Sequence, residues 1–257
     1  MHGFDGHMLL SIMLAAVVGG LIGLDRTALG QFMVSQPIVA GPLTGWVLGD
    51  PVAGLIIGGT LELIWVLDMP VGTFVPADST VATVAATAIV VLGSGGAADP
   101  SVVGFGLLLT VLMAPASRLA DQLMRQRNAQ IPELALSPAG LPTEGRVAFW
   151  HIAGLLVFFL KSFIQCLVMI PAGIAAVSLF LRAPEALHRA MNLYVHVLPL
   201  LGIASAAGKL ATSALDRRLV IGFLIGAVLV TALRLPVGIG VALAAVAAWF
   251  EGRSHAA

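Results

Sequence analysis

Apolar residues recur in blocks along the whole chain, and most blocks are long enough to form a helix. The first block predicts a helix over residues 8–24, which ends at the polar stretch GLDRTALGQFMVSQP, where Pro37 disfavours its continuation. A short Gly-rich segment, IVAGPLTGWVLGD, follows, and further helices are predicted over 51–67 and 79–92. The later blocks predict plainer transmembrane spans over 102–116, 147–181, 193–207, 219–233 and 236–250, with Pro171 as a kink or break.

The blocks in the first part of the chain are short. About 17 residues in 51–67 rise roughly 25 Å as a helix, against a hydrocarbon core of about 30 Å. Asp50 and Pro51 mark a sharp helix start, because Asp caps a helix and Pro fits its first position. Short pieces interrupted by Gly and Pro are typical of broken or re-entrant helices, which need protein or a wet cavity around them. We therefore expect residues 1–100 to be the substrate-handling half.

The composition indicates that these predicted helices belong to a membrane protein. The chain is 59% hydrophobic and 10% charged, too few charges to cover a soluble domain. We predict one all-α membrane domain over 1–257: a polytopic integral membrane protein with several full transmembrane helices, plus short broken or re-entrant helices in its N-terminal half. The first helix is expected to be retained, because it lacks the basic start of a signal peptide. Four arginines in the polar loop 117–146 predict that this loop is cytoplasmic.

Several kinds of partner and chemistry are disfavoured. A net charge of zero argues against a nucleic-acid partner. The single Cys166 permits no intrachain disulfide, and we interpret it as a buried, inert thiol. No metal or cofactor site is predicted, because no Cys/His cluster has metal-binding spacing and no Gly-rich loop carries a nucleotide-binding Lys. His151 and Lys161 interrupt a later apolar block, and we interpret His151 as a buried, hydrogen-bonded residue rather than a catalytic one.

The stretch LELIWVLDMPVGTFVPADST carries three acids and no base in an apolar part of the chain. Glu62 follows Gly54 and Gly58 at intervals of four, so all three share one helix face. An ionised carboxylate in lipid is costly, so Glu62 must face protein or water. It either contacts a substrate or ion, or makes a structural hydrogen bond between helices. Asp78 either caps the next helix or also accepts sugar hydroxyls, and Asp68 is either structural or a solvated loop residue.

The stretch LDRTALGQFMVSQP adds further polar side chains at the first helix break. Asp25 and Arg26 are adjacent and point apart on a helix, so each either pairs with a residue elsewhere or is solvated at the membrane edge. Gln31 and Gln36 can each donate and accept, which suits a polyhydroxyl ligand, but either can instead cap irregular backbone. The candidate substrate-binding residues are therefore Glu62, Asp78, Gln31, Gln36, Asp25 and Asp68.

A family resemblance covers residues 24–92. The segment from Pro37 to Val91, with its Gly-Asp, Gly-Gly-Thr-Leu-Glu, Val-Gly and Pro-Ala-Asp elements, resembles the enzyme IIC membrane subunit of the mannose/fructose/sorbose family of sugar phosphotransferase systems. The later segment WHIAGLLVFFLKSFI is similar to a second-half helix of that family. Mannose-type members carry a shorter Asp-Glu-Phe-Gln-type stretch before the proline. The longer stretch here leaves open which of Asp25, Gln31 and Gln36 takes the corresponding roles.

The resemblance implies the rest of a transport system. Such a subunit pairs with a IID membrane subunit, and cytoplasmic IIA and IIB pass a phosphoryl group between histidines of their own. A hexose-type sugar enters through the membrane pair and leaves as a sugar phosphate. The implied location is the bacterial cytoplasmic (inner) membrane, and a homotrimer follows from the same similarity. By resemblance, Glu62 and Asp78 lie in the sugar-handling region, and the chain itself carries no phosphorylated residue.

Two alternative functions remain open from the sequence. In an ion-coupled secondary carrier, the embedded acids would bind protons or sodium and unmodified sugar would arrive inside. A non-transporting membrane partner would dock IIA or IIB proteins, or sense them, without uptake.

Overall fold

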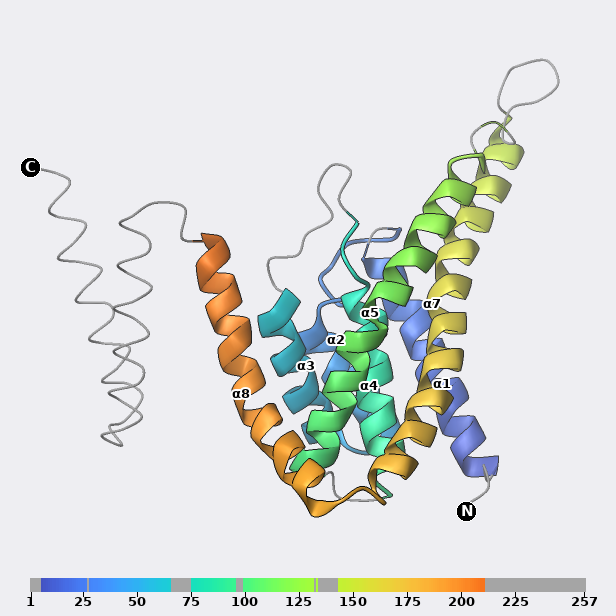
Figure 1. The fold of residues 1–257 in the computed structure, drawn as a ribbon. Helices are drawn as coiled ribbons and strands as arrows, with labels where there is room; N and C mark the ends of the chain where they lie inside the picture. Colours follow the sequence, from blue (N-terminus) through green and yellow to red (C-terminus); the bar gives the residue numbers. More distant parts are fainter. Residues whose placement is uncertain are drawn as a thin grey trace, which may run out of the picture. The chain divides into compact units, whose positions relative to one another are not determined.

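The computed structural model describes residues 6–26, 28–65, 75–95, 99–131, 133 and 143–210, of which 207–210 lack described side chains. Contacts divide the chain into two compact units, residues 1–202 and 203–257, and the packing described below is that of the first unit. Regular structure in the described residues is α-helical (Figure 1), which confirms the predicted class. The helices are α1 (Gly6–Asp25), α2 (Pro37–Leu48), α3 (Pro51–Trp65), α4 (Ser79–Gly93), α5 (Pro100–Asn128), α7 (Glu144–Phe180) and α8 (Glu185–Leu210), the last of which continues into the second unit.

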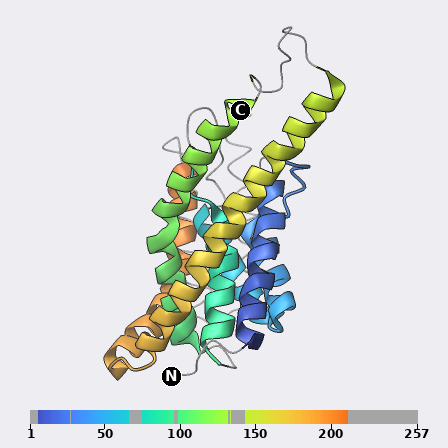
Figure 2. The ribbon, with the colours of Figure 1, turned by 90° about the vertical axis from the view of Figure 1, so that its right-hand side faces the viewer.

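Helix α4 forms the centre of the first unit. It packs against α1, α2, α3, α5 and α7, and each residue from Thr80 to Val90 is buried. A helix built of Val, Ala, Thr and Ile has no polar face to turn outward, so complete burial is its expected environment. Figure 2 shows α7 crossing the face of α4, with α1 and α5 on either side. Whatever begins at the amino end of α4 is therefore enclosed by other helices.

Helices α2 and α3 form a tight hairpin whose glycines lie at the interface. A methyl group added at Gly41 would collide with the carbonyl oxygen of Gly54, and one at Gly54 would collide with that of Gly41. Gly45 meets the backbone of Asp50 and Pro51 at the start of α3, and Gly58 meets that of Pro37 on α2, so small residues let the two helices approach closely. Gly49 is different: it has open space around it and ends α2 with a φ of 94°, a conformation that favours glycine.

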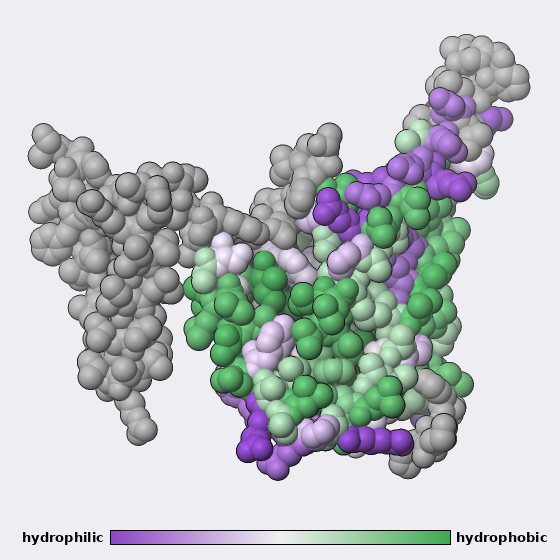
Figure 3. Space-filling model, viewed as in Figure 1, coloured by the Kyte–Doolittle hydropathy of each residue, from purple (hydrophilic) through white to green (hydrophobic). Residues whose placement is uncertain are grey.

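The helix lengths agree with a membrane protein that has a broken first half. Three of the described helices, α1, α5 and α7, are long and apolar enough to cross a membrane. The shorter α2, α3 and α4 have 12, 15 and 15 residues, which is too short for a straight crossing. Figure 3 shows hydrophobic side chains over the middle of the visible face and hydrophilic ones near the upper ends of α5 and α7 and along the lower edge.

Several predicted boundaries differ from the structure. The polar segment 117–146 was predicted as a loop, but α5 continues through it to Asn128 and α7 begins at Glu144. Pro171 does not break α7, and α8 begins at Glu185 rather than at 193. His151 is exposed, so the prediction of a buried histidine is wrong. The predicted spans 219–233 and 236–250 lie outside the described residues.

Candidate functional site

The amino end of α4 carries a buried carboxylate held by two cations. Asp78 caps the helix, because its Oδ1 accepts from the Val81 amide at 3.2 Å. The same oxygen accepts from Arg26 Nη1 at 3.0 Å, and Oδ2 forms an ion pair with Lys161 Nζ. The Asp78 side chain is only 3% exposed, so its charge is taken out of solvent and must be balanced by protein.

The charges continue from Asp78 onto α5. Lys161 Nζ also donates to Asp121 Oδ1 at 3.2 Å, and Asp121 Oδ2 accepts from Arg125 Nε at 2.9 Å. Arg26, Asp78, Lys161, Asp121 and Arg125 thus form one chain of alternating charges, which we call the charge network. It joins the segment after α1 to α4, α7 and α5. The network therefore fixes the start of α4, one of the three short helices.

Sequence reasoning named Asp78 and Arg26 but did not place Lys161 in the site. Of the two alternatives left open for Arg26, the structure shows pairing with a distant residue, since its partner lies 52 positions further along the chain. Lys161 pairs across 83 positions. A lysine inside an apolar block was the available signal, because an intramembrane cation requires a carboxylate or a wet cavity nearby.

Asp25 organises the loop between α1 and α2. Its two carboxylate oxygens accept from the backbone amides of Phe32, at 2.6 Å, and Ser35, at 3.0 Å. The carbonyl of Ser35 in turn accepts from Thr80 Oγ1 at 2.9 Å, which ties the loop to the start of α4. Within the loop, Gln31 has a φ of 55°, which is a left-handed conformation uncommon for a residue with a side chain. The Asp25 side chain thus holds irregular backbone in place.

Glu62 is near the carboxyl end of α3, and its side chain lies beside the amino end of α2. Its Oε2 accepts from the backbone amide of Ile38 at 3.2 Å, so the interhelical hydrogen bond considered for this residue is present. Glu62 is partly exposed, and so is Gln36, which precedes α2 and caps it without a side-chain bond. Gln31 is exposed in the loop. Asp68 lies outside the described residues.

The structure therefore gathers the candidate residues that it describes, all of them but Asp68, around one junction, where the loop after α1, the start of α2 and the start of α4 meet. Asp25 and Asp78 are buried and bonded to protein donors, whereas Glu62 and Gln36 are partly exposed.

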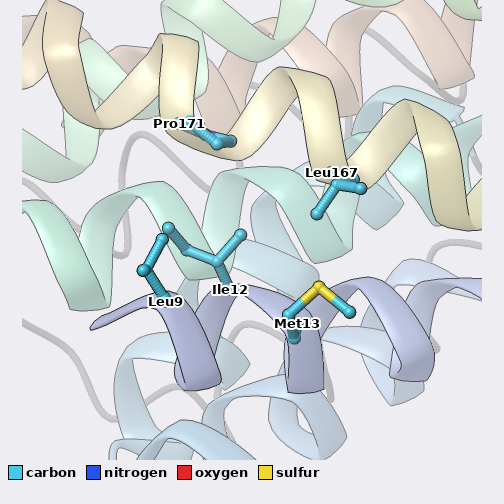
Figure 4. A pocket seen from close by; sticks show the side chains of 5 residues that line it. All are labelled: Leu9, Ile12, Met13, Leu167 and Pro171. Carbon is cyan, nitrogen blue, oxygen red and sulfur yellow. The ribbon is translucent and has the colours of Figure 1, made fainter. Parts of the chain in front are cut away.

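A pocket between α1 and α7 differs from this junction because its lining is apolar (Figure 4). It is lined by Leu9, Ile12, Met13, Leu167 and Pro171. An all-apolar lining offers no hydrogen bonds to a sugar.

Comparison with known proteins identifies the family. The family model described as the PTS (phosphotransferase) system sorbose-specific IIC component matches residues 9–249. The chain belongs to this family. The resemblance found in the sequence is confirmed, and it extends well beyond residues 24–92. The chain is thus a IIC transport component of the mannose/sorbose phosphotransferase class, and its predicted multi-pass location in the inner membrane is confirmed.

Curated relatives of this IIC chain differ in the sugar that their names carry. It is 26% identical over 220 residues to the mannose-specific EIIC component of Escherichia coli K12, covering 85% of this chain and 80% of the relative. It is 26% identical to the fructose permease IIC component of Bacillus subtilis, covering 85% and 79%. The sorbose-specific EIIC component of Klebsiella pneumoniae is 25% identical, with 92% and 86% covered.

Solved structures share the fold of this IIC chain. One, described only as the structure of a membrane protein, has a TM-score of 0.70 at 22% identity and covers 95% of both chains. The cryo-EM structure of the mannose transporter ManYZ in complex with microcin E492 has a TM-score of 0.57 at 24% identity, again covering 95% of both chains. At this identity the likeness establishes the helical fold of a membrane transporter and leaves the substrate to be argued separately.

Proposed function

We propose that this chain is the sugar-translocating IIC subunit of a mannose-family phosphotransferase system. Together with a IID subunit it forms the membrane pathway for a hexose-type sugar. Sugar movement is coupled to phosphorylation of the sugar by IIB, which receives its phosphoryl group from IIA. Family membership supports this function, and the names of the relatives, which carry mannose, fructose and sorbose, support the hexose class.

The observation that carries the proposal is the carboxylate of Glu62, which belongs to α3 and lies beside the start of α2. It is partly exposed beside a helix break, and the hydrogen bond that it accepts from the Ile38 amide uses a fraction of its accepting capacity. A carboxylate accepts hydrogen bonds from sugar hydroxyls without competing as a donor, and bonds to a charged acceptor are stronger than neutral ones. In this proposal Glu62 accepts sugar hydroxyls, with the side chains of Gln36 and Gln31 as further partners.

The other candidate acids take supporting roles in the proposal. Asp25 is bonded to two backbone amides, and Asp78 to Arg26, Lys161 and the Val81 amide. These bonds shape the junction beside Glu62 and keep negative charge there without exposing it to lipid. Asp68 stays a candidate for sugar contact on sequence grounds alone.

Membrane vesicles test the proposal directly. They would contain this chain with its IID partner and would receive phosphorylated IIB and a panel of labelled hexoses. We expect sugar phosphate to form only when the chain is present, and the reactive hexose names the substrate. Vesicles with IID alone are the control.

Other products would indicate the alternative functions. Free sugar that accumulates with a proton or sodium gradient would show an ion-coupled carrier. IIB binding to the vesicles without uptake of any hexose would show a docking or sensing subunit. Either result would overturn the proposed coupling of transport to phosphorylation.

A further inference from the structure

The charge network divides into two halves, each of which contains an ion pair of its own, and Arg125 is bound to the second half through Asp121. Arg26 and Asp78 form one half, at the end of α1 and the start of α4, joined at 3.0 Å. Lys161 and Asp121 form the other half, on α7 and α5, joined at 3.2 Å. The ion pair between Asp78 and Lys161 links the halves, together with a neutral hydrogen bond from the Asp78 amide to Ser117 Oγ at 3.0 Å.

This arrangement differs from an isolated buried ion pair. Separating an isolated pair leaves two unpaired charges in a medium of low dielectric constant, which is strongly unfavourable. If the contact between Asp78 and Lys161 opens, Asp78 keeps Arg26 and Lys161 keeps Asp121. Asp121 also keeps Arg125, whose side chain is 37% exposed. The ion pair between Asp78 and Lys161 can therefore break without leaving either charge unpaired, provided that the two halves stay intact.

We propose that Lys161 is a positioning residue for translocation, whose contact with Asp78 holds α1 and α4 against α5 and α7 and is released when the two pairs of helices shift apart. The proposal rests on the proposed transport function, because a fixed channel would have no need of a separable link. Lys161 touches no sugar in this account. It acts through Asp78, which sets the start of α4 and, through Thr80 and Ser35, the loop next to Glu62.

The chain contains its own reporter for this movement. Cys166 is the single cysteine, lies five residues after Lys161 on α7, and is completely buried. A methyl group added at Gly19 of α1 would lie 2.5 Å from Cys166 Sγ and 3.3 Å from a methyl of Val84 on α4. The thiol is thus enclosed where α1, α4 and α7 meet. Separation of α1 and α4 from α7 uncovers it.

The experiment measures how fast N-ethylmaleimide modifies Cys166 in membrane vesicles that contain the full chain, read as a mass increase. Lys161→Met removes the link and leaves both acids with an arginine partner, so we expect labelling to accelerate. In Asp121→Asn, Asp78 is the only carboxylate among the described residues that still pairs with Lys161. Opening the contact between Asp78 and Lys161 would then leave Lys161 without a carboxylate, so labelling slows. Each change should be roughly three- to twentyfold, the range for one interhelical polar contact in a membrane. Glu185→Gln, at an 82% exposed side chain, is the control and leaves the rate unchanged.

The opposite signs separate positioning from a purely structural role. If the network only holds the bundle together, both substitutions loosen it and both accelerate labelling. That result, or no change in either variant, would overturn the proposal. If Lys161→Met does not fold, as judged by its melting in detergent, Asp121→Asn still decides through its sign, and Lys161→Arg should stay close to wild type. Labelling needs neither sugar nor a partner subunit, so its outcome is independent of the sugar-phosphate assay.

Discussion

At the scale of single residues, the acids of the apolar first half have separate tasks. Asp78 is neutralised by Arg26, directly after α1, and by Lys161 of α7, which both lie far away in the sequence. Asp25 satisfies backbone amides, and Asp50 caps α3 through the amide of Ala53 at 2.9 Å, as predicted. The capping role of Asp50 follows from local sequence, because its partner is three residues away, whereas Asp25 bonds amides seven and ten residues away. The ion pairs do not follow from local sequence, because helix packing decides which distant base meets which acid.

The pairing of Asp78 with Arg26 can be tested by a double-mutant cycle. Asp78→Asn keeps a good helix cap but removes the charge, so Arg26 loses its carboxylate. We expect a destabilisation of about 3 kcal/mol, as is typical when one partner of a buried pair is removed. Arg26→Gln combined with Asp78→Asn should recover most of this loss. Unfolding in detergent micelles measures both, and a double variant as unstable as the sum of the single ones would contradict the pairing.

At the scale of elements, the α2–α3 hairpin depends on backbone contact between its glycines. Glycines four apart on both segments are typical of close helix packing, since small residues let helices approach closely, but their spacing alone does not say which helices meet. The ends of α5 and α7 could not be predicted from hydropathy. The apolar block ends near residue 116, but Leu, Arg, Gln and Met continue to favour helix up to Asn128, so the helix outlasts its apolar part.

The hairpin contact predicts a contrast between two glycines on α3. Gly54→Ala places a methyl group on the carbonyl of Gly41 and should destabilise the fold by about 1–3 kcal/mol through overpacking. Gly59→Ala is the matched control, because its methyl group would meet only Ile38 Cδ1 at 3.5 Å, an ordinary contact. It should be neutral or stabilising by up to about 1 kcal/mol. Thermal unfolding in detergent compares them, and equal losses would argue against the backbone contact.

At the scale of the whole molecule, the sequence predicted a helical membrane protein with a broken first half, and its family. Composition and segment length suffice for the class, because a bilayer demands apolar helices of defined length. The meeting of the loop after α1 with the starts of α2 and α4 could not be predicted, because nothing local brings Ser35 to Thr80 or Asp78 to Ser117. The cytoplasmic position of segment 117–146 stays a prediction from its arginines.

Membrane orientation can be tested with two single cysteines in a Cys166→Ser background. Gln130→Cys lies just beyond α5, and Glu185→Cys lies past the opposite end of α7, a helix of 37 residues. We expect an impermeant thiol reagent added to intact cells to label Glu185→Cys and not Gln130→Cys, with the reverse in inside-out vesicles. Labelling of both from one side would contradict the orientation.

The central claim is that the polar junction around Glu62 carries a sugar across the membrane. The most direct measurement is sugar uptake by vesicles that contain the partner subunit and phosphorylated IIB, comparing wild type with Glu62→Gln and with the exposed control Glu185→Gln. We predict that Glu62→Gln lowers uptake about tenfold to a hundredfold, as expected for the loss of a hydrogen bond to a charged acceptor, whereas the control transports normally. Full uptake by Glu62→Gln would contradict the account.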